Sequence, residues 1–178
     1  MSGFPTLKPA FTVRVNIDAP LAVGSASRSN PLQVVPMTGG TVKGDSGFSP
    51  ALDAEFVGVG NDYIHADADG KHLRLNAHGV LKTKDDALLY LNYTGVVTLT
   101  PAEQAVFAGT ASEGSTPFGN ICEYIAGLSL PEPSLTVALT GDERYKDLEN
   151  RVFVGQGRFN IESGKPVVEY RVSQVHHG

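Results

Sequence analysis

The stretch from Lys71 to Leu99 constrains the fold more than any other part of the chain. Two runs of alternating apolar and polar residues lie on either side of a polar turn at Lys82–Asp86. Because side chains two residues apart in a strand share a face, this pattern predicts a β-hairpin. Its apolar face consists of Leu73, Leu75, Ala77, Leu81, Leu89, Leu91, Tyr93 and Val97. Its other face carries hydrogen-bonding groups: Arg74, Asn76, His78, Tyr90, Asn92 and Thr94.

Other strand-like segments flank this hairpin. Ala10–Ile17 alternates in the same way and is typical of a half-buried strand. Gln33–Lys43 predicts a strand in which Gly39-Gly40 indicates a bulge, a bend at a barrel corner or the close approach of a ligand. A turn at Gly60-Asn61-Asp62 is expected between two short strands. The remaining predicted strands are Asp53–Val59, Tyr63–Ala66, Ser134–Leu139, Arg151–Asn160 and Pro166–Val172.

Helical signals are few. Thr100-Pro101-Ala102-Glu103 combines an N-cap, a proline at the first helical position and a capping box, so a short helix is expected there, ending near Gly109. Asp142–Asn150 predicts one or two helical turns, with Asp142 as the cap. Asn120–Leu130 fits either a strand or a helical turn, and the loop before it is rich in Ser, Gly and Pro.

The fold class follows from the spacing of these elements. About eight to ten short strands, often about 8–12 residues apart, are typical of a barrel or sandwich. We therefore expect a mainly β protein, a single antiparallel β-barrel with one or two short helices. It forms one domain over residues 1–178, with loose termini at 1–9 and 173–178. A barrel of about eight strands has room for side chains or one small ligand.

Composition excludes several classes of function. The net charge is −5, whereas a nucleic-acid surface needs clustered Lys and Arg. The single cysteine, Cys122, excludes an internal disulfide framework and fits a reducing compartment. The N-terminus lacks the pattern of a signal peptide, and no apolar run approaches the roughly 18 residues of a membrane span. We expect a cytoplasmic protein without nucleic-acid or membrane partners.

The polar face of the central hairpin is the first candidate site. His78 has a side chain that can act as an acid or a base at neutral pH. Arg74 can hold an anionic oxygen by two parallel hydrogen bonds, and Tyr90 can donate to a carbonyl group. Asn76 and Asn92 can fix the orientation of a substrate. The same alternation equally fits the solvated outer face of a barrel, and the sequence leaves this choice open.

Other residues complete the candidate site. Asp62 fits a simple turn residue, or it orients His78 as the acidic partner of a catalytic dyad. Thr38 and Thr41 flank the glycine pair, where backbone N–H groups can approach a ligand oxygen. Tyr63 and Tyr93 complete the predicted substrate-binding set.

Cofactor signatures are not found in the sequence. His65, His72 and His78 match no zinc spacing, so no metal is expected. The glycines of Gly155-Gln156-Gly157 make no dinucleotide fingerprint, no GxSxG elbow is present, and Cys122 lacks an electropositive neighbour in sequence that would form a thiolate. We therefore expect no cofactor.

Several segments together resemble one family. VPMTGGTVKG (35–44), GNDY (60–63), LRLNAHGVLKTKDDALLY (73–90) and LTGDERYKDLENRVFVGQGR (139–158) occur in the same order as in the DUF3237 family, also called UPF0311. The resemblance covers residues 11–172 and is greatest to members from filamentous fungi. It implies a compact calycin-like β-barrel, often self-associating as a homodimer or larger homo-oligomer, with a pocket at one end.

The chain departs from the family pattern at two positions and in one segment. Tyr63 stands where bacterial relatives tend to have Trp, and Asn76 stands where they tend to have Asp. If that Asp is a general base in relatives, this chain lacks it. Asn120–Pro133 is longer than usual and can reshape the mouth of a pocket.

These observations favour a cofactor-free enzyme of specialised metabolism. It would bind a small apolar or phenolic polyketide or terpenoid intermediate and promote dehydration, isomerisation or cyclisation, as a lyase, isomerase or cyclase does. Two alternatives remain: a non-catalytic carrier like a lipocalin, and a structural module that dimerises through the hairpin. A polar group at an internal cavity favours the enzyme, and an apolar cavity favours the carrier. A filled barrel with a buried outer face favours the dimerisation module.

Overall fold

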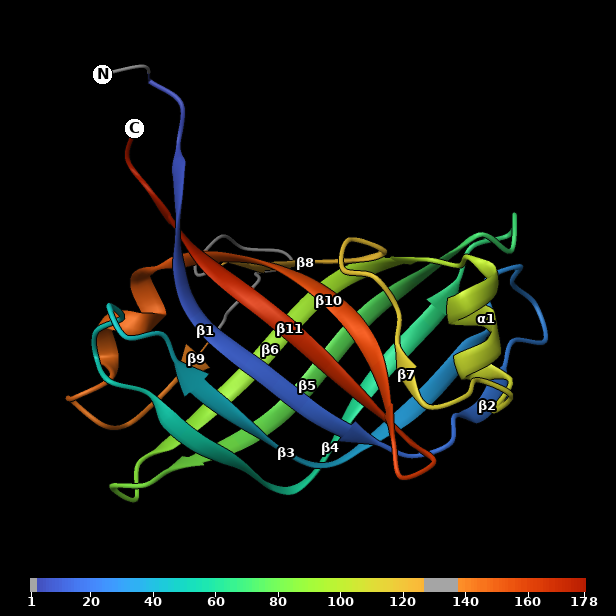
Figure 1. Cartoon of the computed structure of the whole chain (residues 1–178), viewed down its shortest axis with the longest axis horizontal. Helices are drawn as coiled ribbons and strands as arrows, with labels where there is room; N and C mark the ends of the chain where they lie inside the picture. The colour runs from blue at the N-terminus through green and yellow to red at the C-terminus, as the bar shows by residue number, and fades with distance from the viewer. Residues whose placement is uncertain (1–2, 127–137) are drawn as a thin grey trace.

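Eight antiparallel strands close into a barrel in the computed structural model, which describes residues 3–126 and 138–178 (Figure 1). The barrel closes because β1 pairs on one side with β11 and on the other side with β3. This arrangement confirms the predicted fold class. The order around the barrel is β1 (Thr6–Ile17), β11 (Lys165–His176), β10 (Val152–Glu162), β8 (Ile121–Ala126), β6 (Leu88–Thr98), β5 (His72–Thr83), β4 (Asp53–Ala66) and β3 (Leu32–Gly44).

The apolar face of the central hairpin points into the barrel. Leu75 and Ala77 of β5 are buried, and so are Leu91 and Tyr93 of β6, where Tyr93 lies opposite Ala77 and Leu91 lies opposite Gly79. Alternating residues of β1, β10 and β11 complete the same core, among them Val13, Val15, Phe153, Phe159, Val168 and Val172. Burial of this face removes the largest apolar surface from water, so the polar face of the hairpin lies outside.

Strand β4 is a single strand, which corrects the prediction of two strands separated by a turn. Its register against β5 shifts between Val57 and Asn61, where residues 58–60 lie opposite Gly79 alone. Gly58 has a φ of 70°, a left-handed conformation that favours glycine. The bulge adds two residues, and an even number preserves the alternation of faces. Asp62 therefore lies on the same inward face as Phe56 and Ile64.

The glycine pair of β3 marks a bend without interrupting the strand. Gly40 has a φ of 140°, and a Cβ atom there would overlap the carbonyl oxygen of Arg14 on β1. The register against β4 shifts between Met37 and Thr41, so the pair lies in a bulge, one of the three interpretations of the sequence. Residues 18–30 contain the short strand β2 (Leu21–Gly24), and the loop predicted before Asn120 contains β7 (Gly114–Ser115).

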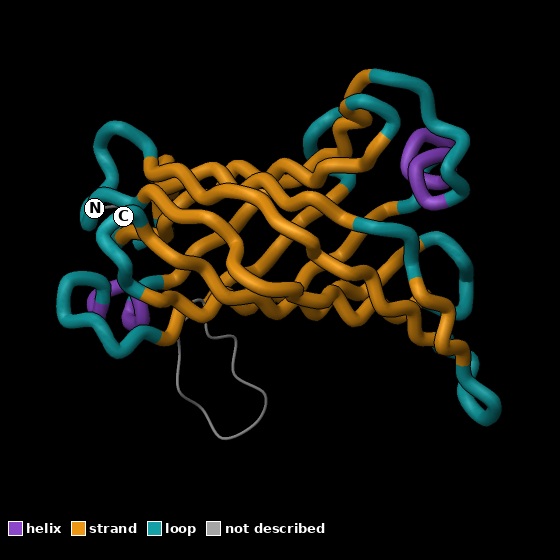
Figure 2. The backbone as a smooth tube through the Cα atoms, turned by 90° about the horizontal axis from the view of Figure 1, so that it is seen from below, coloured by secondary structure: helices purple, strands orange, loops and turns teal. Residues whose placement is uncertain are grey.

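Two short helices lie at opposite ends of the barrel (Figures 1 and 2). Helix α1 (Pro101–Phe107) has the predicted capping box: Thr100 accepts from the N–H of Ala102, and Glu103 accepts from the N–H of Thr100 at 3.2 Å. Glu103 is fully buried and also accepts from Asn120 at 3.1 Å. The second helix is the 3₁₀ helix η1 (Lys146–Asn150), inside the predicted helical segment. No helix among the described residues is long and apolar enough to cross a membrane.

The ambiguous segment Asn120–Leu130 begins as a strand, β8. Its remainder, and most of the strand predicted at Ser134–Leu139, lie outside the described residues. Ala138–Leu139 form β9, which pairs with β6.

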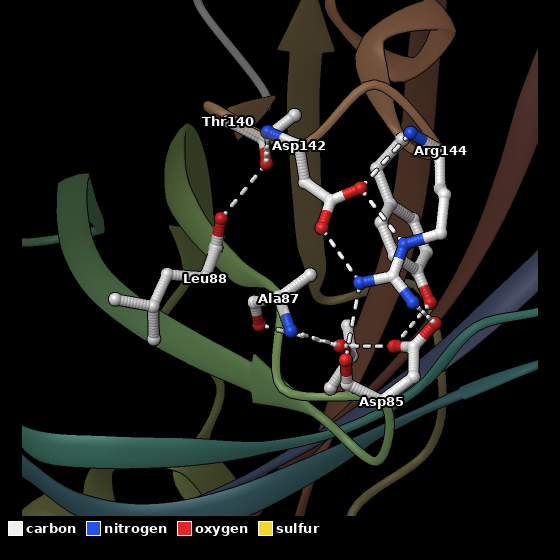
Figure 3. Close-up of polar contacts among 8 residues, drawn as sticks. Asp85, Ala87, Leu88, Thr140, Asp142 and Arg144 are labelled. Atoms are coloured by element: carbon white, nitrogen blue, oxygen red, sulfur yellow. Dashed lines mark hydrogen bonds and ion pairs between the residues drawn. The ribbon is translucent and has the colours of Figure 1, made fainter.

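An ion-pair network fixes the η1 end of the barrel (Figure 3). Arg144 donates to Asp85 and to Asp142, at 2.6 Å in each case, and the Tyr145 hydroxyl donates to Asp85 at 2.9 Å. The side-chain and backbone hydrogen bonds from Arg144 lower the pKa of Asp142 to about 2. Thr140 also donates to the carbonyl oxygen of Leu88 at 2.9 Å. This network ties the turn between β5 and β6 to the segment before η1, so these acidic residues have a structural role.

Candidate functional site

A small cavity lies inside the barrel at the α1 end. Its lining is almost entirely apolar, and Asp62 is the one carboxylic acid among the described residues that border it. Phe107 of α1 and Phe159 of β10 close the cavity, with ring centroids 5.4 Å apart in an edge-to-face arrangement. The complete lining is Ile17, Val35, Met37, Asp62, Ile64, Leu75, Tyr93, Val97, Phe107, Phe159, Val168 and Tyr170.

Among the described acidic residues of the interior, Asp62 has the pKa that is shifted furthest from its usual value. Its residue exposure is 7%, and its Oδ1 accepts one hydrogen bond of 2.9 Å from the backbone N–H of Asn76. Burial raises its pKa from 3.8 to about 7, because a single N–H donor offsets only part of the lost hydration. A carboxyl group whose pKa is raised toward neutrality can both donate and accept a proton near neutral pH.

Two tyrosines border the same cavity. Tyr93 and Tyr170 are buried, and their ring centroids lie 5.5 Å apart in an edge-to-face contact. The Tyr93 hydroxyl lies 3.8 Å from the sulfur of Met37. The cavity thus combines a carboxyl group and phenol groups with apolar walls.

Large side chains fill the middle of the barrel. Gly60, Gly79 and Gly157 provide the space: a Cβ atom at Gly60 would lie 2.6 Å from Cε of Met37, and one at Gly157 would lie 2.5 Å from Cε1 of Tyr170. The cavity at the α1 end consequently has a volume of about 20 Å³, enough for one water molecule. A second interior cavity of about 20 Å³ lies at the η1 end, bordered by Phe11, Leu52, Leu148 and Phe153 among others.

The predicted polar site of the hairpin lies on the outer surface of the barrel. His78 and Tyr90 are half-buried there, and Nδ1 of His78 is hydrogen-bonded to the Tyr90 hydroxyl. The amide nitrogen of Asn92 lies 3.0 Å from the same Nδ1 and donates to the carbonyl oxygen of Ala77 at 3.2 Å. The ring of Tyr63 contacts His78 at 5.9 Å between centroids. The structure therefore brings together His78, Tyr90, Asn92 and Tyr63, but not inside the barrel.

Arg74 is not part of this cluster, contrary to the prediction. Its guanidinium binds Asp67 in a bidentate way, at 3.1 and 2.6 Å, and its side chain is 54% exposed. Asp62 is not the partner of His78 either, because the two residues lie on opposite faces of the sheet. The physical reason is the register of the two strands: Asn61 pairs with His78 and Asp62 pairs with Ala77, so Asp62 faces the other side of the sheet from His78.

The remaining predicted residues are spread over the barrel. Asn76 contributes its backbone N–H to Asp62, and its side chain is on the outer face, where its Oδ1 lies 3.5 Å from the amide nitrogen of Asn92. The exposed Thr38 places its hydroxyl 3.4 Å from the carbonyl oxygen of Asn16, and Thr41 is half-buried on β3. Tyr93 alone of the predicted substrate-binding set borders the interior cavity.

Sequence reasoning missed Tyr170 and Phe107. A signal for Tyr170 was present, since Val168, Tyr170 and Val172 alternate within a predicted strand. For Phe107, the helix was predicted, but its docking over the barrel end was not.

The described residues contain one group that resembles a metal site, formed by Asp67, Asp69 and His72 in and beside the turn between β4 and β5. Asp67 already accepts the guanidinium of Arg74, whose positive charge opposes a cation there. The group therefore fits an ion-paired turn better than a metal centre.

The fold and the interior define a small closed β-barrel with an internal cavity at one end. The chain belongs to the DUF3237 family, described as proteins of unknown function, whose model matches residues 5–175. This match confirms the family predicted from the sequence. The calycin-like form of the barrel and the greater similarity to fungal members stay predictions. A comparison with curated proteins finds no match.

Solved structures share the fold at low sequence identity. A conserved protein of unknown function from Rhodopseudomonas palustris is 18% identical with a TM-score of 0.73, over 97% of this chain and 99% of that one. A β-barrel-like protein from Acinetobacter baumannii is 21% identical with a TM-score of 0.65, over 97% of both chains. A protein described as an enzyme from Penicillium herquei is 17% identical with a TM-score of 0.57, over 97% of this chain and 95% of that one.

Proposed function

We propose that this protein is an acid–base catalyst of specialised metabolism whose reaction takes place at the α1 end of the barrel interior, around Asp62. The substrate is a small apolar or phenolic polyketide or terpenoid intermediate, and the reaction is a dehydration, isomerisation or cyclisation. The observation that carries the proposal is the buried carboxyl group of Asp62 at an apolar cavity, with its pKa raised to about 7.

The chemistry follows from this environment. The ionised form of Asp62 accepts a proton from a hydroxyl group or an acidic carbon of the substrate, and the protonated form returns a proton to the product or to a leaving hydroxyl group. The hydrogen bond from the backbone N–H of Asn76 holds Oδ1 of Asp62 in place. The other carboxyl oxygen, Oδ2, is then the one that exchanges a proton with the substrate. Tyr93 and Tyr170 also line the cavity, and a phenol hydroxyl that reaches the substrate can stabilise a developing enolate or alkoxide.

Access to Asp62 requires movement at the barrel end. A cavity of about 20 Å³ holds a water molecule, whereas ligand sites have volumes of about 300–1,000 Å³. Phe107 is half-buried and belongs to a helix of only seven residues, so we expect displacement of its ring to open this end. The apolar ring that leaves is replaced by the apolar body of the substrate.

The fold of a known enzyme supports the proposal by analogy. The Penicillium herquei protein described as an enzyme has the same barrel, although its identity to this chain is 17%. A fold carries many functions, so the argument depends on Asp62 and its cavity.

Turnover by matched variants tests the proposal. The protein is incubated with a panel of phenolic and polyene compounds that carry a hydroxyl group β to a carbonyl, and mass spectrometry detects loss of water or a new product of unchanged mass. We expect Asp62→Asn to slow turnover by about 100-fold or more, the usual contribution of a general acid–base group. Asp86→Asn is the matched control, because Asp86 lies in an exposed turn at a φ of 68° that Asn also adopts.

Two outcomes would overturn the proposal. Turnover that is equal in wild type and Asp62→Asn excludes Asp62 as the acid–base group. Saturable binding of panel members without any turnover identifies the protein as a carrier.

A further inference from the structure

An open hollow lies on the outer surface of the barrel, lined by residues of β1, β8, β10 and β11, on the other side of the sheet from the interior cavity. Its volume is about 520 Å³, within the range of about 300–1,000 Å³ for small-molecule sites. The side chains of Leu7, Phe118 and Val154 make part of its lining apolar. Gln156 and Ser173 add hydrogen-bonding groups. The one charged residue among the described residues that line it is Arg171.

The guanidinium of Arg171 is held in position but makes no hydrogen bond within the described part of the chain. It stacks over the ring of Phe118 with 5.0 Å from Cζ to the centroid, and 70% of its side chain is exposed. Its nearest acidic atom is Oε1 of Glu169, 3.8 Å from Nε, which is too far for a hydrogen bond. By contrast, Arg14, Arg74, Arg144, Arg151 and Arg158 all donate side-chain hydrogen bonds.

The carboxylate of Glu169 does not neutralise Arg171, because it is already engaged by other donors. It accepts from Arg158 at 3.1 Å, from Asn160 at 3.0 Å and from Arg14 at 3.4 Å. Arg14 in turn binds Glu162 at 2.6 Å. Three guanidinium groups thus share two carboxylates, and the excess positive charge is at Arg171, on the solvent side of the cluster.

We propose that this hollow binds small organic carboxylates that have an aromatic or aliphatic body. The carboxylate binds the planar donors of Arg171, which the stacking on Phe118 already orients. The body of the ligand covers Leu7 and Val154, while the Phe118 ring already carries the guanidinium groups of Arg158, at 4.5 Å, and Arg171. This site is separate from the one around Asp62, so neither proposal depends on the other.

Calorimetric titration with sodium 1-naphthoate tests the charge requirement, and neutral 1-naphthamide is the matched probe. We expect saturable binding of 1-naphthoate, and a loss of about tenfold or more in affinity both for the amide and for the Arg171→Gln variant. Arg28→Gln is the control variant, because Arg28 is an exposed arginine that does not line the hollow. Asp62→Asn should bind 1-naphthoate with unchanged affinity.

The single cysteine gives a second, independent readout. Cys122 lines the hollow and is exposed, so we expect iodoacetamide to alkylate it in the free protein. We expect 1-naphthoate to slow this alkylation in wild type and Arg28→Gln, and to have no effect in Arg171→Gln. Absence of saturable binding, equal affinity for acid and amide, or unchanged affinity in Arg171→Gln would each overturn the proposal. Loss of naphthoate binding in Asp62→Asn would show instead that the ligand occupies the interior.

Discussion

The backbone N–H of Asn76 donates a hydrogen bond of 2.9 Å to Oδ1 of Asp62, from strand β5 to the inward face of β4. This bond holds the carboxyl group at the wall of an otherwise apolar cavity. A single neutral donor does not compensate for the lost hydration of a carboxylate, so the protonated form is favoured. A buried carboxyl group with a raised pKa destabilises the core, and residues of this kind are common at functional sites.

Stability should decrease with rising pH because of Asp62. Its pKa is 3.8 when exposed and about 7 in the folded protein, so the folded state binds the extra proton between these values. The stabilisation is complete below about pH 4 and is lost as the pH rises to about 7, by at most about 1.4 kcal/mol per pH unit. Urea unfolding of wild type and Asp62→Asn at several pH values measures this difference. A difference that does not change between pH 4 and pH 8 would contradict the raised pKa.

Gly157→Ala should destabilise the barrel. The added Cβ atom would lie 2.5 Å from Cε1 of Tyr170, and the ring of Tyr170 cannot move away without disturbing Tyr93. Overpacking of this kind costs about 1–3 kcal/mol. Gly47→Ala is the control, since nothing lies within 4 Å of its added Cβ atom. Thermal unfolding measures both variants, and equal melting temperatures would contradict the packing described here.

Asp85→Asn should loosen the η1 end of the barrel. The change removes the charge that pairs with Arg144 at 2.6 Å, and it leaves one oxygen where the carboxylate uses one for Arg144 and the other for the Tyr145 hydroxyl, at 2.9 Å. We expect faster amide hydrogen exchange in residues 140–150 and a lower melting temperature. Lys146→Gln breaks only an exposed pair with Glu143 and serves as the control. Exchange that increases equally in both variants would argue against a special role of this network.

His78→Ala separates the two candidate sites. The proposal for the barrel interior predicts that this variant retains turnover, because His78 lies on the outer face with Tyr90 and Asn92. The original prediction for the polar face of the hairpin requires that turnover is lost. Rates of wild type, His78→Ala and Asp62→Asn on the same substrate decide between them. If turnover falls in His78→Ala and not in Asp62→Asn, the active site is on the outer face around His78 and not in the barrel interior.

Much of the fold could be predicted from local patterns. The alternation in residues 71–99 identified the central hairpin, and its apolar residues form one wall of the core. Thr100, Pro101 and Glu103 predicted the start of α1, because capping depends on residues that are close in sequence. The spacing of the strands indicated a barrel.

The position of Asp62 could not be predicted in this way. Glycines on either side of Val59 and the polar pair Asn61-Asp62 have the composition of a turn, so the local sequence predicts a turn there. In the folded protein, β3 and β5 pair with both halves of β4, and this long-range pairing outweighs the local preference. The sequence shows that Phe56, Asp62 and Ile64 are an even number of residues apart, as residues on one face of a strand are. Only the pairing with β3 and β5 shows that they belong to the same strand.

The sequence by itself determined that the central hairpin has one apolar and one polar face, because alternation is a property of neighbouring residues. Only the tertiary structure decided which face lines the interior, and with it that Asp62, and not His78, borders the cavity. The physical reason is that closing the barrel needs the pairing of β1 with β3, which are far from the hairpin in the chain. Closure buries one face of every strand at the same time, and a carboxyl group on that face then loses the water that would keep it ionised.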